Sequence, residues 1–158
     1  MAIRRIKTGD ASCLYKIAKP VVSFDSRLGE LLDDMAETMY HADGVGLAAP
    51  QVGVLRRAVV IDCSMDRDGL IEAVNPEIIY TEGEQAGMEG CLSFPDDQGW
   101  VVRPNVAVMR AFDRHGNEFE LRGEGLLARA MLHECDHLDG KVYKRLVVPT
   151  PEEYKEEE

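Results

Sequence analysis

The pentapeptide His133-Glu134-Cys135-Asp136-His137 constrains the fold more than any other feature, because its spacing suits one turn of a helix. Residues four positions apart share a helix face, so His133 and His137 can bind one metal ion while Glu134 lies beside it. Such a motif also arises by chance on solvent-exposed helices, and a third ligand elsewhere in the chain would argue against chance. The pattern predicts a helix from Leu126 to Leu138, with Gly125 before it and Gly140 as its stop.

Length and composition indicate one compact domain, expected over residues 1–150. The chain has 158 residues, of which 45% are hydrophobic and 30% charged. Its formal charge of −11, without a cluster of Lys and Arg, argues against DNA or RNA as a partner. Five Glu among the last seven residues indicate a disordered acidic tail at 151–158.

Targeting signals are not evident in the sequence. No apolar stretch follows Arg4 and Arg5, and no apolar run approaches the roughly 18 residues of a membrane span. We therefore expect a cytoplasmic protein with no membrane partner.

The pattern of apolar residues predicts an α+β fold. Phe24 to about His41 should form the first helix, with Asp25 or Ser26 as its N-cap. Five apolar residues recur at helical spacing and should face the core: Leu28, Leu31, Leu32, Met35 and Met39.

Three segments rich in β-branched residues predict strands, namely Ala58–Asp62, Ile71–Tyr80 and Val106–Asp113. The turn formers at 113–117 should lead into a hairpin partner at Glu118–Leu121. We expect a single domain in which antiparallel strands pack around a central helix carrying the two histidines, with an N-terminal helix beside them.

Gly44-Val45-Gly46-Leu47-Ala48-Ala49 matches the G-x-G-x-x-A pattern of dinucleotide-binding turns. That turn must follow a strand and open a helix, whereas here a helix precedes it and Pro50 follows. We interpret the segment as bent and extended, with glycines that let a ligand or another strand approach the backbone.

Four scattered cysteines without a CxxC pair favour reduced thiols over a disulfide framework. Cys91 lies between Gly90 and a polar turn, where it can serve as the third metal ligand or simply as a small buried hydrophobe. Cys135 points to a different helix face from His133, so Cys135, Cys13 and Cys63 are expected to pack in the interior.

Three segments together resemble the signature motifs of the peptide deformylase family, in the expected order and at the expected separations. They are Gly44-Val45-Gly46-Leu47-Ala48-Ala49-Pro50-Gln51, Glu89-Gly90-Cys91-Leu92-Ser93 and His133-Glu134-Cys135-Asp136-His137-Leu138. The resemblance implies a metallohydrolase of protein biosynthesis that acts on a linear amide. Its expected reaction removes the formyl group from the initiator methionine of nascent polypeptides and releases formate.

The resemblance also implies residue roles. Cys91, His133 and His137 would hold a divalent metal, natively Fe(II), with Ni(II), Co(II) or Zn(II) as substitutes. Glu134 would be the general base and acid, while the Gln51 side-chain amide and the Leu92 backbone N–H would form the oxyanion hole. A divalent metal lowers the pKa of bound water toward ~7, and each preset donor contributes on the order of 3 kcal/mol in comparable sites.

Substrate binding is expected to use mainly the peptide backbone. The segments at Val45–Gly46 and Gly90 can pair with an extended formyl-Met peptide as an added strand. The resemblance also implies an apolar pocket that receives the methionine side chain, and here Val45, Leu126, Ala130 and His133 are its expected lining.

Two other functions stay open at this point. An HExxH peptidase is disfavoured, because such sites draw a third ligand from downstream and little sequence follows His137. A metal-binding or nascent-chain-binding protein without turnover is the non-enzymatic alternative. The segment after Gly140 is short and acidic, so any ribosome contact is not expected to use a basic tail.

Overall fold

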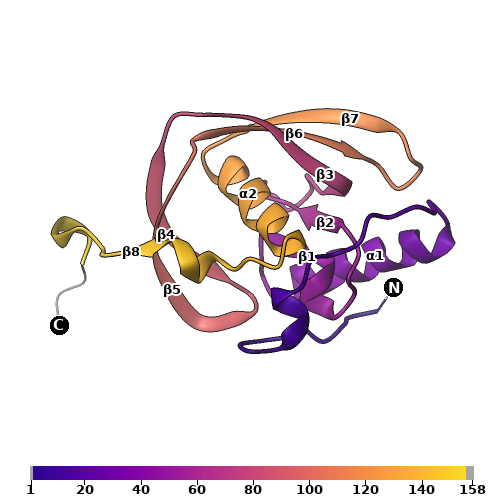
Figure 1. Cartoon of the computed structure of the whole chain (residues 1–158), viewed down its shortest axis with the longest axis horizontal. Coiled ribbons are helices and arrows are strands. Elements are labelled where there is room, and N and C mark those ends of the chain that lie inside the picture. The colour runs from indigo at the N-terminus through magenta and orange to yellow at the C-terminus, as the bar shows by residue number, and fades with distance from the viewer. Residues whose placement is uncertain (1, 156–158) are drawn as a thin grey trace.

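The computed structural model describes residues 2–155 and has two α-helices and two antiparallel sheets (Figure 1). The helices are α1 (Ser26–His41) and α2 (Leu126–Leu138). One sheet has the order β1-β2-β3-β6-β7, with β1 (Gly46–Ala48), β2 (Ala58–Ile61), β3 (Ile71–Glu82), β6 (Val106–Phe112) and β7 (Glu118–Glu124). The other has the order β4-β5-β8, with β4 (Gln85–Cys91), β5 (Phe94–Arg103) and β8 (Val147–Val148). Short 3-10 turns are η1 (Ser12–Tyr15), η2 (Ala49–Val52), η3 (Tyr143–Leu146) and η4 (Glu152–Tyr154).

The five-stranded sheet lies between the two helices, so its central strands are buried on both faces. In β2, Ala58 and Val60 pack with α1, whereas Val59 and Ile61 pack with α2, and none of the four is exposed. This double burial explains the continuous apolar run of β2. The expected α+β class is confirmed, with the helices covering opposite faces of one sheet.

Helix α1 forms where the sequence predicts it, two residues later than Phe24. The Asp25 side chain accepts a hydrogen bond from the Leu28 backbone N–H at 3.1 Å, which satisfies one of the free donors at the helix start. All five apolar residues of the predicted stripe are buried against the sheet. Within residues 2–155, no helix is long and apolar enough to span a membrane.

Helix α2 occupies the centre of the molecule and has the predicted bounds. It contacts β1, β2, β3, β6 and β7, and Figure 1 shows β6 and β7 passing over it. Gly140, with φ of +72°, ends it, and a Cβ there would lie 2.8 Å from the Tyr15 carbonyl. The position of His133 and His137 is therefore fixed by the core itself.

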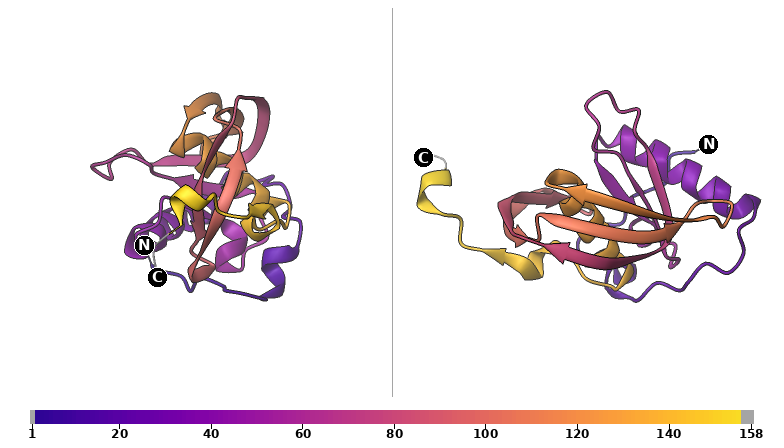
Figure 2. Two further views of the ribbon diagram at one scale, coloured as in Figure 1. Left: turned by 90° about the vertical axis from the view of Figure 1, so that its left-hand side faces the viewer. Right: turned by 90° about the horizontal axis from the view of Figure 1, so that it is seen from above.

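The three-stranded sheet was not predicted from the sequence. Strands β4 and β5 form a hairpin whose tight turn joins Cys91 to Phe94, and β8 pairs with β5. Beyond β8 the chain extends away from the body (Figure 2), and the Tyr154 ring lies 4.9 Å from that of Trp100. Residues 156–158 of the expected acidic tail lie outside the described residues.

Candidate metal centre and active site

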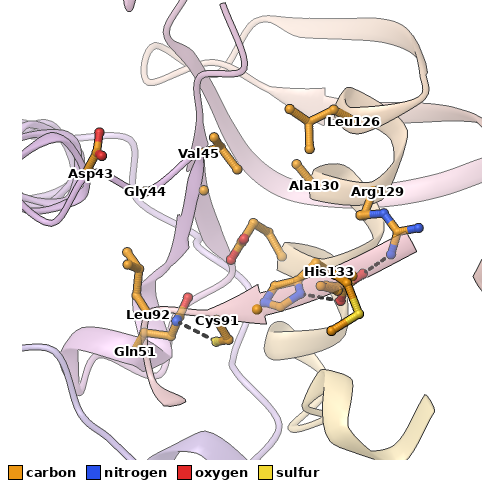
Figure 3. Close-up of a pocket in the computed structure, with 15 residues that line it drawn as sticks. Asp43, Gly44, Val45, Gln51, Cys91, Leu92, Leu126, Arg129, Ala130 and His133 are labelled. Carbon is orange, nitrogen blue, oxygen red and sulfur yellow. Dashed lines mark hydrogen bonds and ion pairs between the residues drawn. The ribbon is translucent and has the colours of Figure 1, made fainter. Parts of the chain in front are cut away.

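A cavity of about 280 Å³ opens between β1, the end of β4 and α2 (Figure 3). It brings together residues from all three segments that the sequence singled out. Those predicted residues that line it are Val45, Gly46, Gln51, Gly90, Cys91, Leu92, Leu126, Ala130, His133 and Glu134. His137 lies directly beneath, with its ring centroid 4.9 Å from that of His133.

Cys91, His133 and His137 present their donor atoms to one another at the base of the cavity. Cys91 Sγ lies 3.4 Å from His137 Nε2, and the two histidine Nε2 atoms are 3.2 Å apart. All the candidate ligand atoms fall within 4.8 Å of one another. Ligands held at 2.0–2.3 Å by a tetrahedral ion are separated by roughly 3.3–3.6 Å. One thiolate and two imidazoles at these separations therefore fit a divalent metal, and three protein ligands leave a fourth position open for catalysis.

The two imidazoles have very different proton affinities. Burial lowers the pKa of His137 to about 3, helped by the nearby charge of His133, so His137 is neutral at pH 7. Burial alone would also lower the pKa of His133, but Glu134, Cys91 and Glu89 raise it to about 10. A positive charge is thus favoured where the donor atoms converge. A divalent cation can supply that charge in place of the proton.

Glu134 is buried beside the donor atoms and faces the cavity. Its Oε1 has no hydrogen-bond partner within the described residues, although the atom is fully buried. Burial raises its pKa to about 7; His133 opposes this shift and Glu89 reinforces it. A carboxyl group with this pKa can accept and release a proton near neutral pH, as a general acid or base must.

Gln51 is held so that its amide N–H₂ points toward Cys91. Its Oε1 accepts a hydrogen bond from the Ala48 backbone N–H at 2.9 Å. Because an N–H group needs an acceptor, this contact fixes the orientation of the amide, with Nε2 on the side away from Ala48. Nε2 lies 3.4 Å from Cys91 Sγ and donates to Ser93 Oγ at 3.1 Å. Leu92 follows Cys91 in the turn between β4 and β5 and lines the same cavity.

The sequence did not reveal the network of buried ion pairs and hydrogen bonds around Glu89 that holds His133. The buried Glu89 carboxylate accepts hydrogen bonds from Arg103 Nε at 2.8 Å and Nη2 at 2.7 Å, and from Arg129 Nη1 at 2.8 Å. Its other contact is His133 Nδ1 at 2.7 Å, which leaves Nε2 of that ring to face Cys91 and His137. Burial would raise the pKa of Glu89, but Arg103 and His133 hold it well below its usual range. Arg103 also pairs with Asp136 at 3.2 Å.

The cavity lies between the free edges of both sheets. β1 ends the five-stranded sheet and β4 ends the three-stranded one. Because the Asp62 N–H binds the Val45 carbonyl, Gly46 falls at the alternate position, where its own N–H and C=O point away from β2. Figure 3 shows Val45 across the cavity from Leu126 and Ala130. An extended chain could therefore pair with an edge while a side chain enters between these apolar groups.

The three other cysteines are half-buried, and two of them pack against the apolar core. Cys63 and Cys135 both pack against the apolar cluster that α2 forms with the five-stranded sheet. Burial raises the pKa of Cys63 to about 11 and that of Cys135 to about 12, so both are thiols at neutral pH. Within the described residues, none of the four cysteines forms a disulfide bond.

Comparisons with known proteins agree with this geometry. The family model described as polypeptide deformylase matches residues 3–150. Peptide deformylase of Caldicellulosiruptor bescii is 56% identical over 148 residues, which cover 94% of this chain and 87% of that relative. Peptide deformylase 1 of Bacillus subtilis is 51% identical over 143 residues, covering 90% and 89%. The crystal structure of a peptide deformylase from Legionella pneumophila has a TM-score of 0.90 at 49% identity, covering 94% of this chain and 88% of that one.

Proposed function

Because the chain belongs to the peptide deformylase family, we propose that it removes the formyl group from the initiator methionine of nascent polypeptides and releases formate. It is accordingly a hydrolase. The single observation that carries the proposal is the convergence of Cys91, His133 and His137 beside Glu134, in a cavity between two sheet edges.

The proposed ligands are Cys91 Sγ and the Nε2 atoms of His133 and His137, with Fe(II) as the native ion and Ni(II), Co(II) or Zn(II) as substitutes. When bound there, a divalent ion would lower the pKa of water and polarise the formyl oxygen. Glu89 supports this role for His133, because its carboxylate takes the Nδ1 side of the ring. The choice among these ions depends on supply as well as on the ligands.

Glu134 is the proposed proton carrier. Its unpartnered, buried Oε1 and its pKa near 7 suit it to take a proton from water and deliver it to the departing nitrogen. The Gln51 amide Nε2 and the Leu92 backbone N–H are the proposed donors to the formyl oxygen as negative charge develops on it. Ala48 and Ser93 fix the amide before substrate arrives, so little reorganisation is needed.

The proposed substrate lies as an extended strand between Val45–Gly46 and Gly90. Backbone pairing at these edges gives affinity without requiring a particular sequence. The methionine side chain would enter the pocket formed by Val45, Leu126, Ala130 and His133. A pocket of this kind separates close apolar analogues by only about 1–3 kcal/mol, so norleucine should be accepted.

We infer that the protein works in the cytoplasm on nascent chains, without DNA or a membrane as partner. Glu152 and Glu153 near the C-terminus would repel the phosphates of ribosomal RNA. A ribosome contact would thus use another surface.

The test is formate release from formyl-Met-Ala-Ser by protein purified without oxygen and loaded in turn with Fe(II), Ni(II), Co(II) and Zn(II). Peptide-bond cleavage is followed in the same reactions, and Glu134→Gln is the matched variant. We expect metal-dependent formate release with the peptide intact, and no turnover by the variant. Peptide fragments would indicate a peptidase, and absence of any product would favour the binding-protein alternative.

A further inference from the structure

The loop at 62–70, which joins β2 to β3, lies outside the cavity but binds the backbone that forms one of its walls. The Asp62 N–H donates to the Val45 carbonyl at 2.9 Å. From the same loop, Arg67 Nη2 donates to the Gly44 carbonyl. Figure 2 shows this loop projecting from the body of the molecule.

The buried Asp62 carboxylate organises the loop from within. It accepts hydrogen bonds from Tyr40 Oη at 2.6 Å, the Ser64 N–H at 2.9 Å and the Gly69 N–H at 3.2 Å. Burial would raise the pKa of Asp62, but a hydrogen bond from the Ser64 hydroxyl, together with these three, lowers it to about 2. The carboxylate is therefore charged at neutral pH and ties the loop to α1 through Tyr40.

Arg67 is fixed at three points. Its Nη1 donates to the Asp62 carbonyl at 2.8 Å, its Nη2 reaches the Gly44 carbonyl, and its guanidinium carbon lies 5.1 Å from the centroid of the Tyr40 ring. It has a φ of +57°, an unfavourable value for a residue with a side chain. Within the described residues it forms no ion pair with a carboxylate. The half-buried guanidinium thus interacts with the backbone carbonyls of Asp62 and Gly44 and with the face of the Tyr40 ring.

Movement of Gly44 would affect two parts of the cavity. Gly44 is followed by Val45 and Gly46, which form its wall and its free strand edge. It also packs tightly on Leu92, because a Cβ at position 44 would lie 2.6 Å from Leu92 Cδ1. A shift at Gly44 would therefore alter both the edge of β1 and the turn that follows Cys91.

We propose that Arg67 is a positioning residue for substrate, which holds the Gly44 carbonyl and so sets the Val45–Gly46 edge against which the peptide backbone pairs. This inference rests on the proposed function. Arg67 does not line the cavity, so its loss should weaken peptide binding while the reacting groups stay in place. A Lys at this position supplies a point charge without the planar fork that reaches two carbonyls.

The experiment compares steady-state kinetics of the wild type, Arg67→Ala and Arg67→Lys on formyl-Met-Ala-Ser and on formyl-Met. Asp66→Ala is the matched control, because Asp66 is an exposed residue of the same loop. For Arg67→Ala we expect KM for the tripeptide to rise about tenfold, the effect of losing one hydrogen bond to a charged group, with kcat within about twofold. The rise should be smaller for formyl-Met, which has no downstream backbone to pair. Arg67→Lys should be intermediate and Asp66→Ala unchanged.

An unchanged KM for the tripeptide in Arg67→Ala would overturn the proposal, as would a fall in kcat alone. Equal rises in KM for both substrates would also overturn it, since backbone pairing would then not be involved. Should Arg67→Ala fail to fold, Arg67→Lys and Tyr40→Phe, which removes the hydroxyl that binds Asp62, are judged by the same KM criterion. If the wild type releases no formate, the proposed function has failed; calorimetric binding of formyl-Met-Ala-Ser to the wild type and Arg67→Ala then decides the role of Arg67 by itself.

Discussion

At the scale of single residues, position 46 must be glycine because of a neighbour and not because of its backbone. Its φ is outside the left-handed region that favours glycine. A Cβ there would instead overlap the Glu134 carboxylate at Oε2. The absence of a side chain at 46 therefore leaves room for the proposed base.

Gly46→Ala should abolish most activity while the protein stays folded. The added methyl must displace the Glu134 carboxylate, and misplacing a reacting group by about 1 Å can cost roughly 100-fold in rate. The measurement is formate release together with thermal unfolding. Gly87→Ala is the control, since a Cβ there meets nothing closer than Arg129 Nη2 at 3.6 Å. Similar rates for both variants would contradict this account.

Glu89 is the residue on which the orientation of His133 depends. We predict that Glu89→Gln weakens metal binding by about 10–100-fold, because the ring loses the carboxylate that holds its Nδ1 side. Competition with a chelator measures the metal affinity, and Glu84→Gln, at an exposed position just before β4, is the control. Equal affinity in Glu89→Gln and wild type would show that the network does not orient His133.

Sequence reasoning located the proposed ligands but not the groups behind them. His133 and His137 could be found because helical spacing alone places them together. Glu89 could not be assigned a role, since its partners Arg103 and Arg129 are 14 and 40 residues away. Only tertiary structure shows which distant charges share a buried position.

At the scale of elements, the helices were predictable and one sheet was not. α1 and α2 carry apolar residues at helical spacing over several turns, and their ends carry Asp25, Gly125 and Gly140. β4 has the sequence Gln-Ala-Gly-Met-Glu-Gly-Cys, without a β-branched residue, and β5 begins with Phe-Pro-Asp-Asp. These strands exist because they pair with each other, which local preference does not reveal.

The N-cap of α1 gives a prediction about stability alone. Asp25→Ala should lower the free energy of unfolding by about 1 kcal/mol, because the Leu28 N–H loses its acceptor. Formate release should not change, since Asp25 does not line the cavity of the proposed site. Denaturant unfolding provides the measurement, with Ser23→Ala as control. A loss of activity without a loss of stability would be inconsistent with a capping role.

The loop between β2 and β3 should make stability depend on pH. The folded pKa of Asp62 is lowered from 3.8 to about 2 by its hydrogen bonds to Ser64, Tyr40 and Gly69. A lowered pKa stabilises the fold above the unfolded value, by about 2 kcal/mol here, and this contribution is lost as pH falls from 3.8 toward 2. Asp62→Asn should therefore be less stable at pH 7, and its difference from wild type should shrink over that interval. If the difference in unfolding free energy between Asp62→Asn and the wild type stayed constant from pH 7 to pH 2, it could not arise from the lowered pKa of Asp62.

At the scale of the whole molecule, the cavity arises from the way two sheets meet at one helix. β1 and β4 each end a sheet, and α2 supports the site between these edges. Sequence patterns identify strands but not which of them end a sheet, so the two-edged cavity could not be derived from them. The topology leaves two strand edges free for the proposed backbone pairing, while α2 and the turn at Cys91 carry the residues of the proposed chemistry.

The most direct test is to measure metal content and formate release on the same preparations of wild type, Cys91→Ser and Cys135→Ser. Cys135 lies in the chain between the two proposed histidine ligands, two residues from each. Cys91, in contrast, places its sulfur atom beside the candidate ligand atoms of both histidines. We predict about one ion per chain and normal turnover for the wild type and Cys135→Ser, and loss of both for Cys91→Ser. A Cys91→Ser protein that keeps a full complement of metal and wild-type rates would show that Cys91 is not a ligand of the catalytic metal.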